Sequence, residues 1–234
     1  MRDDQTLTPL LRLQQFADSA LPVGGAAHSF GLESLVDLGL LDTEGLEAFL
    51  LEYLEEAGAL EAAYCSSSSD LARHGANDSI REWLALNEEL CSRKLVRESR
   101  DGSAAMGRRF LELAAQVSDL GILVAAVEHA AVTGTQVHLA PCFGLAAGAM
   151  GAGSELAVSA YLQQSMTTLV SCCQRLLPLG QTRAQQILWN LKPVMVAVAK
   201  RSASAPVGRL SCFTPLLDVA SATHPTQHTR LFMS

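Results

Sequence analysis

The sequence predicts an all-α protein, folded as a single-domain helical bundle of roughly eight to ten helices. Apolar residues make up 49% of the chain but aromatic residues only 5%, so Leu, Ala and Val must build the core. That composition favours packed helices over a β-sandwich, which needs more aromatic and β-branched residues. Apolar positions recur at helical spacing, and no run alternates as a strand would. At 234 residues the chain is long enough for one large core.

The expected helices follow one another along almost the whole chain. In chain order they cover 9–17, 28–39, a helix that starts at 46, 79–95, 103–117, 120–131, 142–150, 154–177 and 182–200, with a short helix after Pro215. The helix that starts at 46 ends either within 66–69 or at 74–75. No composition break demands a second domain. We therefore expect one helical domain over 1–205 and a C-terminal tail over 206–234.

Capping residues and prolines set several of these boundaries. Thr8-Pro9 and Thr214-Pro215 each have the form of an N-cap residue followed by Pro at the first helical position. Pro193 falls inside the helix expected over 182–200. It should kink or restart that helix, because proline removes a backbone donor.

Charge and cysteine usage exclude several classes of protein. The net charge is −7 and the longest basic cluster is Lys200-Arg201, so we expect no nucleic-acid partner. No apolar run reaches the ~18 residues that a membrane span needs. The six cysteines form no C-x-x-C pair, and the acidic N-terminus lacks the apolar core of a signal peptide. These features predict a reduced, cytoplasmic protein without a membrane partner.

No catalytic, cofactor or metal site can be assembled from the sequence. The glycine-rich stretch 148–153 follows no strand and contains no phosphate-binding loop motif, which favours close helix packing. His224 and His228 have helical metal-ligand spacing, but Pro225 lies between them. Two exposed tail histidines are the favoured interpretation, with a weak, transient nickel contact as the alternative. We expect no enzyme activity and no cofactor.

The segment 21–33 combines a proline, paired glycines, a histidine and an aromatic residue just before a helical pattern. On a helical wheel His28 points with the apolar residues, which predicts a core histidine that holds a turn. Phe30 points with the polar residues, among them Glu33. An aromatic side chain in that place is either covered by another segment or offered to a partner.

The helix expected over 154–177 has a polar face that is almost uncharged. Tyr161, Gln164, Thr168 and Arg175 lie on it, opposite an apolar arc. A Tyr/Arg face with few charges has the composition of an interface centre. The alternative is an internal helix that contacts others on both sides.

The C-terminal tail is too apolar for an unattached terminus. Residues 210–220 and 230–233 are both rich in Leu, Phe and other apolar residues. Such a tail either docks on its own domain or becomes ordered on a partner.

These three segments carry a resemblance to a known family. Leu21-Pro22-Val23-Gly24 with the stretch 28–33, His-Ser-Phe-Gly-Leu-Glu, is similar to a signature of the UreF-type urease accessory proteins. Leu177-Pro178-Leu179-Gly180-Gln181-Thr182, preceded by Arg175, resembles a second motif of that family. Phe213-Thr214-Pro215-Leu216-Leu217-Asp218, followed by His224 and by 230–234, resembles its C-terminal pattern.

The resemblance implies an all-α accessory factor that is not itself an enzyme. It implies a homodimer that bridges a UreD/UreH-type protein and the GTPase UreG, and helps to load nickel into apo-urease. The tail from Phe213 onward would engage the UreD/UreH-type partner, and the Tyr161–Arg175 face and the Phe30 region would serve dimer or GTPase contacts. A nickel-binding metallochaperone module is the alternative function.

The predicted functional residues fall into two groups. The candidate partner-binding residues are Phe30, Glu33, Tyr161, Gln164, Thr168, Arg175, Phe213, Leu216, Leu217, Asp218, His224, Arg230, Leu231 and Phe232. The residues expected to shape turns are Pro22, Gly24, His28, Gly31, Pro178 and Gly180.

Overall fold

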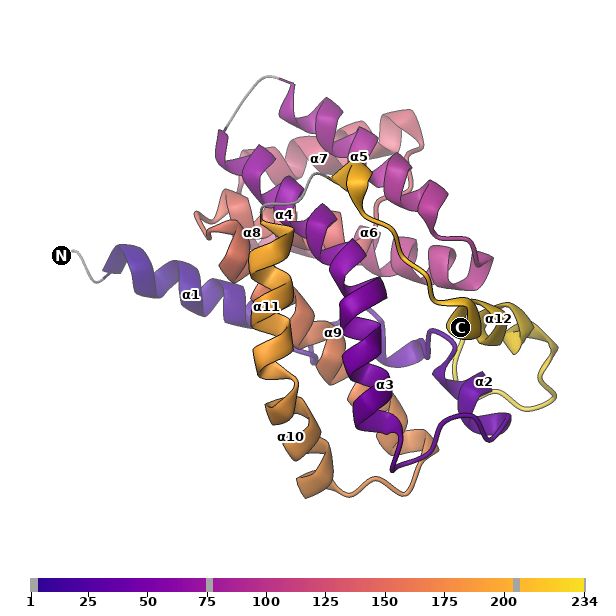
Figure 1. Cartoon of the computed structure of the whole chain (residues 1–234). Helices are drawn as coiled ribbons and strands as arrows, with labels where there is room; N and C mark the ends of the chain where they lie inside the picture. Colours follow the sequence, from indigo (N-terminus) through magenta and orange to yellow (C-terminus); the bar gives the residue numbers. More distant parts are fainter. Residues whose placement is uncertain (1–3, 75–77, 204–206, 234) are drawn as a thin grey trace.

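The computed structural model describes residues 4–74, 78–203 and 207–233, which form α-helices, short helical turns and no β-strand (Figure 1). The predicted all-α class is therefore confirmed. The α-helices are α1 (Asp4–Phe16), α2 (Leu32–Asp37), α3 (Leu46–Tyr53), α4 (Ala59–His74), α5 (Ser79–Arg93), α6 (Arg97–Ser118), α7 (Gly121–Thr133), α8 (Leu139–Ala149), α9 (Ser154–Leu176), α10 (Gln181–Asn190), α11 (Lys192–Ser202) and α12 (Pro215–Thr223).

Several predicted boundaries are confirmed. The long helix expected from residue 46 runs through α3, a π-helical turn η2 (Leu54–Gly58) and α4. The helix with Pro193 restarts there as α11, and α12 begins at Pro215 after Thr214. If α3–η2–α4 and α10–α11 are each counted as one helix, the described residues form ten helices, within the predicted range.

Four helix starts were predicted wrongly: α6 and α8 begin at Arg97 and Leu139, six and three residues before the predicted starts, and the other two concern α2 and α1. The helix expected over 28–39 is only α2, because Phe30 and Gly31 have φ values of 52° and 90°, outside the helical region. His28 is therefore in an extended conformation and not on a helical wheel. The first helix begins before Pro9, which lies inside α1, so Thr8 does not cap it.

The core centres on α4, α8 and α9. Gly144 and Gly148 let α8 lie directly against the backbone of α4. A methyl group on Gly144 would lie 2.8 Å from the carbonyl carbon of Cys65, and one on Gly148 equally close to that of Ser69. Of the glycine-rich stretch 148–153, Gly148 thus serves helix packing as its sequence context indicated, whereas Gly151 and Gly153 have no atom near their missing side chains.

Aromatic rings join the outer helices to this core. Phe110 of α6 stacks on Phe143 of α8 at 5.5 Å between ring centroids, and Phe143 lies 5.8 Å from Tyr161 of α9. Phe16 of α1 meets Phe110 edge-on at 5.6 Å. Trp83 of α5 is fully buried and donates its indole N–H to the Pro141 carbonyl at 3.1 Å. These five aromatic residues thus connect α1, α5, α6, α8 and α9.

The C-terminal segment (207–233) runs across the domain from α5 to α12, which lies beside α2 (Figure 1). The Arg93 guanidinium donates to the Leu210 carbonyl at 2.7 Å, and the Phe213 N–H donates to Glu56 at 2.9 Å. The boundary predicted at 205–206 lies outside the described residues, as does Ser234. None of the described helices combines the length and the apolar character that a bilayer span needs.

Candidate functional site

Glu33, at the start of α2, is the anchor of the C-terminal segment. Its carboxylate is buried and accepts the backbone N–H groups of Leu231 at 2.6 Å and Phe232 at 3.2 Å. The same carboxylate lies 2.8 Å from Nε2 of His224. Three groups of the segment therefore converge on a single side chain of the N-terminal signature.

His224 and two further charged side chains complete this cluster. The His224 ring is fully buried, and its Nδ1 lies 2.8 Å from Glu98 of α6. Arg230 approaches the other oxygen of Glu98 at 3.6 Å. We call Glu33, Glu98, His224 and Arg230 the Glu33 cluster.

The prediction of two exposed tail histidines is wrong for His224. α12 ends at Thr223, so His224 and His228 do not share a helical face. His228 is exposed, whereas both ring nitrogens of His224 face carboxylates. In the part of the chain that the structure describes, no group of three or more potential ligands is placed to hold a metal ion.

Arg175, at the end of α9, joins the second signature to the first and third. It donates to the Ala26 carbonyl at 2.8 Å, and its guanidinium carbon lies 4.2 Å from the centre of the Phe232 ring. The Met233 N–H donates to the Ala27 carbonyl at 2.7 Å. The three segments that the sequence singled out therefore meet in one place.

The turn residues differ in what the fold requires of them. Gly24 and Gly31 have φ values of 88° and 90°, which favour glycine. A methyl group on Gly31 would also lie 3.2 Å from the Leu217 carbonyl oxygen, so Gly31 lets α12 approach closely. Pro22 and Pro178 are exposed.

The other two turn residues are less strictly placed. His28 is buried, as predicted, and its ring lies 5.7 Å from that of Phe30. Gly180 precedes α10 in an extended conformation with no atom near its missing side chain, so neither strain nor space requires glycine there.

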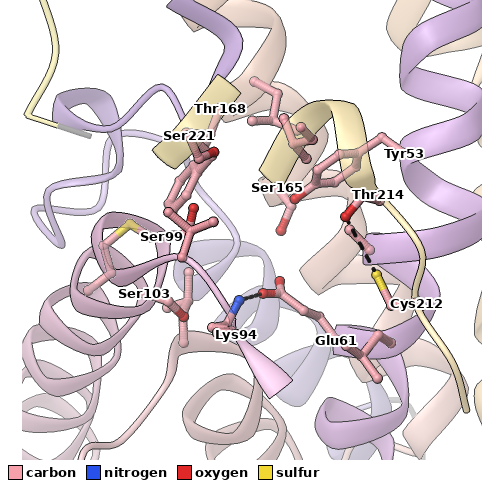
Figure 2. Close-up of a pocket in the computed structure, with 18 of the residues that line it drawn as sticks. Tyr53, Glu61, Lys94, Ser99, Ser103, Ser165, Thr168, Cys212, Thr214 and Ser221 are labelled. Carbon is pink, nitrogen blue, oxygen red and sulfur yellow. Dashed lines mark hydrogen bonds and ion pairs between the residues drawn. The ribbon is translucent and has the colours of Figure 1, made fainter. Parts of the chain in front are cut away.

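A cavity of about 150 Å³ lies beneath the segment Cys212–Ser221. Figure 2 shows Ser165, Thr168 and Ser221 facing it from one side and the Glu61–Lys94 ion pair from the other. Six of the candidate partner-binding residues line this cavity: Phe30, Tyr161, Gln164, Thr168, Leu217 and Asp218. Phe30 is half-buried and lines this cavity beneath the C-terminal segment.

Tyr161 and Gln164 are buried in this chain, which matches the alternative of an internal helix at these two positions. The Tyr161 hydroxyl donates to Glu61, whose other oxygen accepts from Lys94. Burial alone would raise the pKa of Glu61, but Lys94 and Tyr161 outweigh it and hold that pKa below its ordinary value. Burial, and then the Glu61 charge, raises the pKa of Tyr161, so its hydroxyl remains a donor. The Gln164 side-chain oxygen is buried without a hydrogen-bond partner among the described residues.

Tyr161→Phe should destabilise the fold by about 2 kcal/mol at pH 7, because the buried Glu61 carboxylate loses a donor. The pKa of Glu61 in the folded chain lies below its ordinary value of 4.5. The Glu61 carboxylate therefore stabilises the fold fully above pH 4.5, and this stabilisation is lost as the pH falls through the pKa of the folded chain. The difference in unfolding free energy between Tyr161→Phe and the original chain should therefore shrink at pH 3. Urea denaturation at both pH values measures it.

Tyr53→Phe is the matched control, because Tyr53 lines the same cavity without a described hydrogen bond to Glu61. Equal losses for the two variants, or a loss for Tyr161→Phe that is unchanged at pH 3, would contradict this role for Tyr161.

The outer face of the C-terminal segment is apolar and exposed. Phe213 is 78% exposed, Leu216 51% and Val219 60%. Leu231 and Met233 are also exposed. The segment thus buries some of its side chains, Phe232 among them, and leaves these five uncovered. We call these five side chains the outer apolar face.

Sequence reasoning found part of this site and missed part of it. Asp218 is half-buried, and burial raises its pKa. Val219 and Met233 were missed, although Val219 follows Leu216 at helical spacing. Glu98 was also missed, because a glutamate in the first turn of a polar helix carries no sign of a distant partner.

Comparison with known proteins shows the family of this chain. The UreF family model matches residues 40–192. The urease accessory protein UreF of Trichormus variabilis is 33% identical over 236 residues, which cover 99% of this chain and 100% of that protein. The UreF proteins of a Nostoc species (33% over 237 residues; 99% and 100% covered) and of Paenarthrobacter aurescens (31% over 229 residues; 96% and 97% covered) are also similar. The chain belongs to the UreF family of urease accessory proteins.

Proposed function

We propose that this protein is a non-enzymatic scaffold of urease maturation that binds a UreD/UreH-type protein through the outer apolar face. The observation that carries the proposal is an exposed apolar surface on a segment that Glu33 holds to the domain. A preorganised apolar surface binds at a lower entropic cost than a segment that must first fold. Aromatic residues and Met are enriched in protein interfaces, and Phe213 and Met233 belong to this face.

The same scaffold would bring the GTPase UreG and apo-urease together for nickel insertion, as a cytoplasmic homodimer. These partners follow from membership of the family and from the resemblance of the three signature segments. Their binding faces on this chain remain predictions, as do the contacts of Thr168 and Arg175.

The two buried glutamates of the site are paired with donors, which supports a role in binding rather than in catalysis. Glu61 is paired with Lys94 and Tyr161, and Glu33 with backbone N–H groups and His224. Burial raises the pKa of Cys173 to about 12, so this thiol is not activated. Both nitrogens of His224 are engaged, which weighs against the metallochaperone alternative.

The test is co-elution of the purified chain with a UreD/UreH-type protein and UreG, with GTP and nickel, by size exclusion with light scattering. The proposal predicts a complex of defined stoichiometry built on two copies of this chain. A monomer that binds neither protein would overturn it.

Phe213→Ser should weaken binding of the UreD/UreH-type protein by about tenfold or more, because Phe213 is a large side chain of the outer apolar face. Its melting temperature should stay unchanged. Val132→Ser, on α7 and 87% exposed, is the matched control and should alter neither quantity. Unchanged binding by Phe213→Ser would remove Phe213 from the interface. Titration calorimetry and thermal melts provide the two readouts.

A further inference from the structure

The cavity beneath the segment Cys212–Ser221 has the size of a small-molecule site. Its volume is about 150 Å³, and an apolar cavity of roughly that volume holds a benzene ring. Apolar side chains from distant parts of the chain line it, among them Val23, Phe30, Leu60, Met106, Leu169 and Leu217. Burial of an apolar ring against these side chains is favourable, because it removes apolar surface from water.

Polar groups are placed among these apolar side chains. Figure 2 shows Ser165, Thr168 and Ser221 facing the cavity from one side, and Ser99 of α6 also lines it. A hydroxyl group can both donate and accept a hydrogen bond. A few convergent polar groups in a mostly apolar pocket are typical of ligand sites, because they fix the orientation of the bound molecule.

One acceptor of the lining lacks a described donor. Gln164 lines the cavity and is only 4% exposed, and its side-chain oxygen is buried without a hydrogen-bond partner among the described residues. A buried acceptor without a donor is costly. A molecule in the cavity that carries a hydroxyl group supplies such a donor.

An interruption of the regular helix geometry lies at the same cavity. The π-helical turn η2 separates α3 from α4, and its Ala57 lines the cavity together with Tyr53 and Leu60 on either side of the turn. Single π-helical turns within α-helices occur frequently at functional sites. This second observation, independent of the cavity's polar groups, also points to a ligand site.

The charged side chains of the lining favour a neutral ligand. Lys94 is paired with Glu61, and Arg93 with Glu89. Of the described charged side chains that line the cavity, only Asp218 is left to offer a ligand an opposite charge, and burial raises the pKa of this carboxyl. A charged ligand would lose its hydration here for little return.

We propose that this cavity binds a small neutral molecule that combines an apolar ring with one hydroxyl group. The ring lies among the apolar side chains, and the hydroxyl group bonds the Gln164 oxygen and the neighbouring serine and threonine hydroxyls. Because Leu217 and Ser221 of α12 line the cavity, the bound molecule also holds the C-terminal segment to the domain. The proposal does not depend on which protein binds the outer apolar face.

Phenol is the probe, because it is a benzene ring with one hydroxyl group. Titration of the full-length chain, followed by backbone amide chemical shifts, should show saturable binding with a dissociation constant of about 1 mM or tighter. The Asp218 amide, which donates to the Thr214 carbonyl at 2.9 Å, should gain protection from hydrogen exchange when phenol is bound. Shift changes that do not saturate would overturn the proposal and leave the cavity as a site for water only.

Two variants of α6 test whether phenol binds in this cavity. Ser99→Leu places a larger side chain in the cavity and should abolish the binding, whereas Ala105→Leu, at an exposed position of the same helix, should leave it unchanged. Thermal melts show whether each variant is folded. Unchanged phenol affinity in a folded Ser99→Leu chain would place the molecule elsewhere and refute the assignment.

Gln164→Met tests the hydroxyl contact even where Ser99→Leu does not fold. Methionine has a similar length but lacks the amide acceptor. Phenol binding should weaken by about three- to tenfold, whereas benzene binding should not weaken. Equal weakening of both, or of neither, would contradict the proposed contact between a ligand hydroxyl group and Gln164.

Discussion

Glu33→Gln is expected to lose about 3–5 kcal/mol of unfolding free energy, because a buried charged acceptor with three partners is replaced by a neutral amide. The amide oxygen can serve part of this set, while the amide nitrogen is a donor that meets other donors. The C-terminal segment should detach, and the Leu231 and Phe232 amides should lose their protection. Urea denaturation and hydrogen exchange measure the two effects.

Glu112→Gln is the matched control for this prediction. Glu112 is paired with Arg108 one helical turn away in α6, and both side chains are largely exposed. Such a surface pair contributes at most about 1 kcal/mol. Losses of similar size for the two variants would show that Glu33 does not anchor the segment.

Gly144→Ala is expected to destabilise the fold by about 3 kcal/mol, at the upper end of what an extra methyl group costs in a packed core. The added methyl would press on the backbone of α4 near the Cys65 carbonyl, and a backbone cannot change rotamer to make room. The two helices must move apart, and the loosened packing would reach the rings of Phe143 and Tyr161. Thermal and urea denaturation give the loss.

Gly121→Ala tests whether this effect comes from crowding. Gly121 begins α7 and has no atom near its missing side chain. Alanine there should leave stability unchanged or raise it by about 0.4–1 kcal/mol. If Gly144→Ala is equally harmless, α8 does not lie on the α4 backbone as described.

Helical periodicity and prolines predicted most of the fold because they act within a few residues. Pro193 and Pro215 mark the starts of α11 and α12 for that reason. The turn before α2 was misjudged, because Phe30 takes a left-handed conformation that its residue type does not favour. Phe30 lines the cavity beneath the C-terminal segment, a placement that no local pattern encodes.

The candidate site was predictable only as separate pieces. Glu33, Arg175 and Phe232 were each singled out, yet nothing in the sequence showed that they meet. His224 illustrates the reason, because its partners Glu33 and Glu98 lie far away in the chain. The spacing to His228 suggested a nearby partner, whereas tertiary packing supplied two distant carboxylates.

The central claim is that Glu33 stabilises this protein by holding its C-terminal segment. The most direct test compares Glu33→Gln in the full-length chain and in a chain ending at Thr223, which lacks His224, Leu231 and Phe232. The account predicts a loss of about 3–5 kcal/mol in the full-length chain and of less than about 1 kcal/mol in the shortened one. Equal losses in the two backgrounds would contradict it, because Glu33 would then act on the helical domain alone.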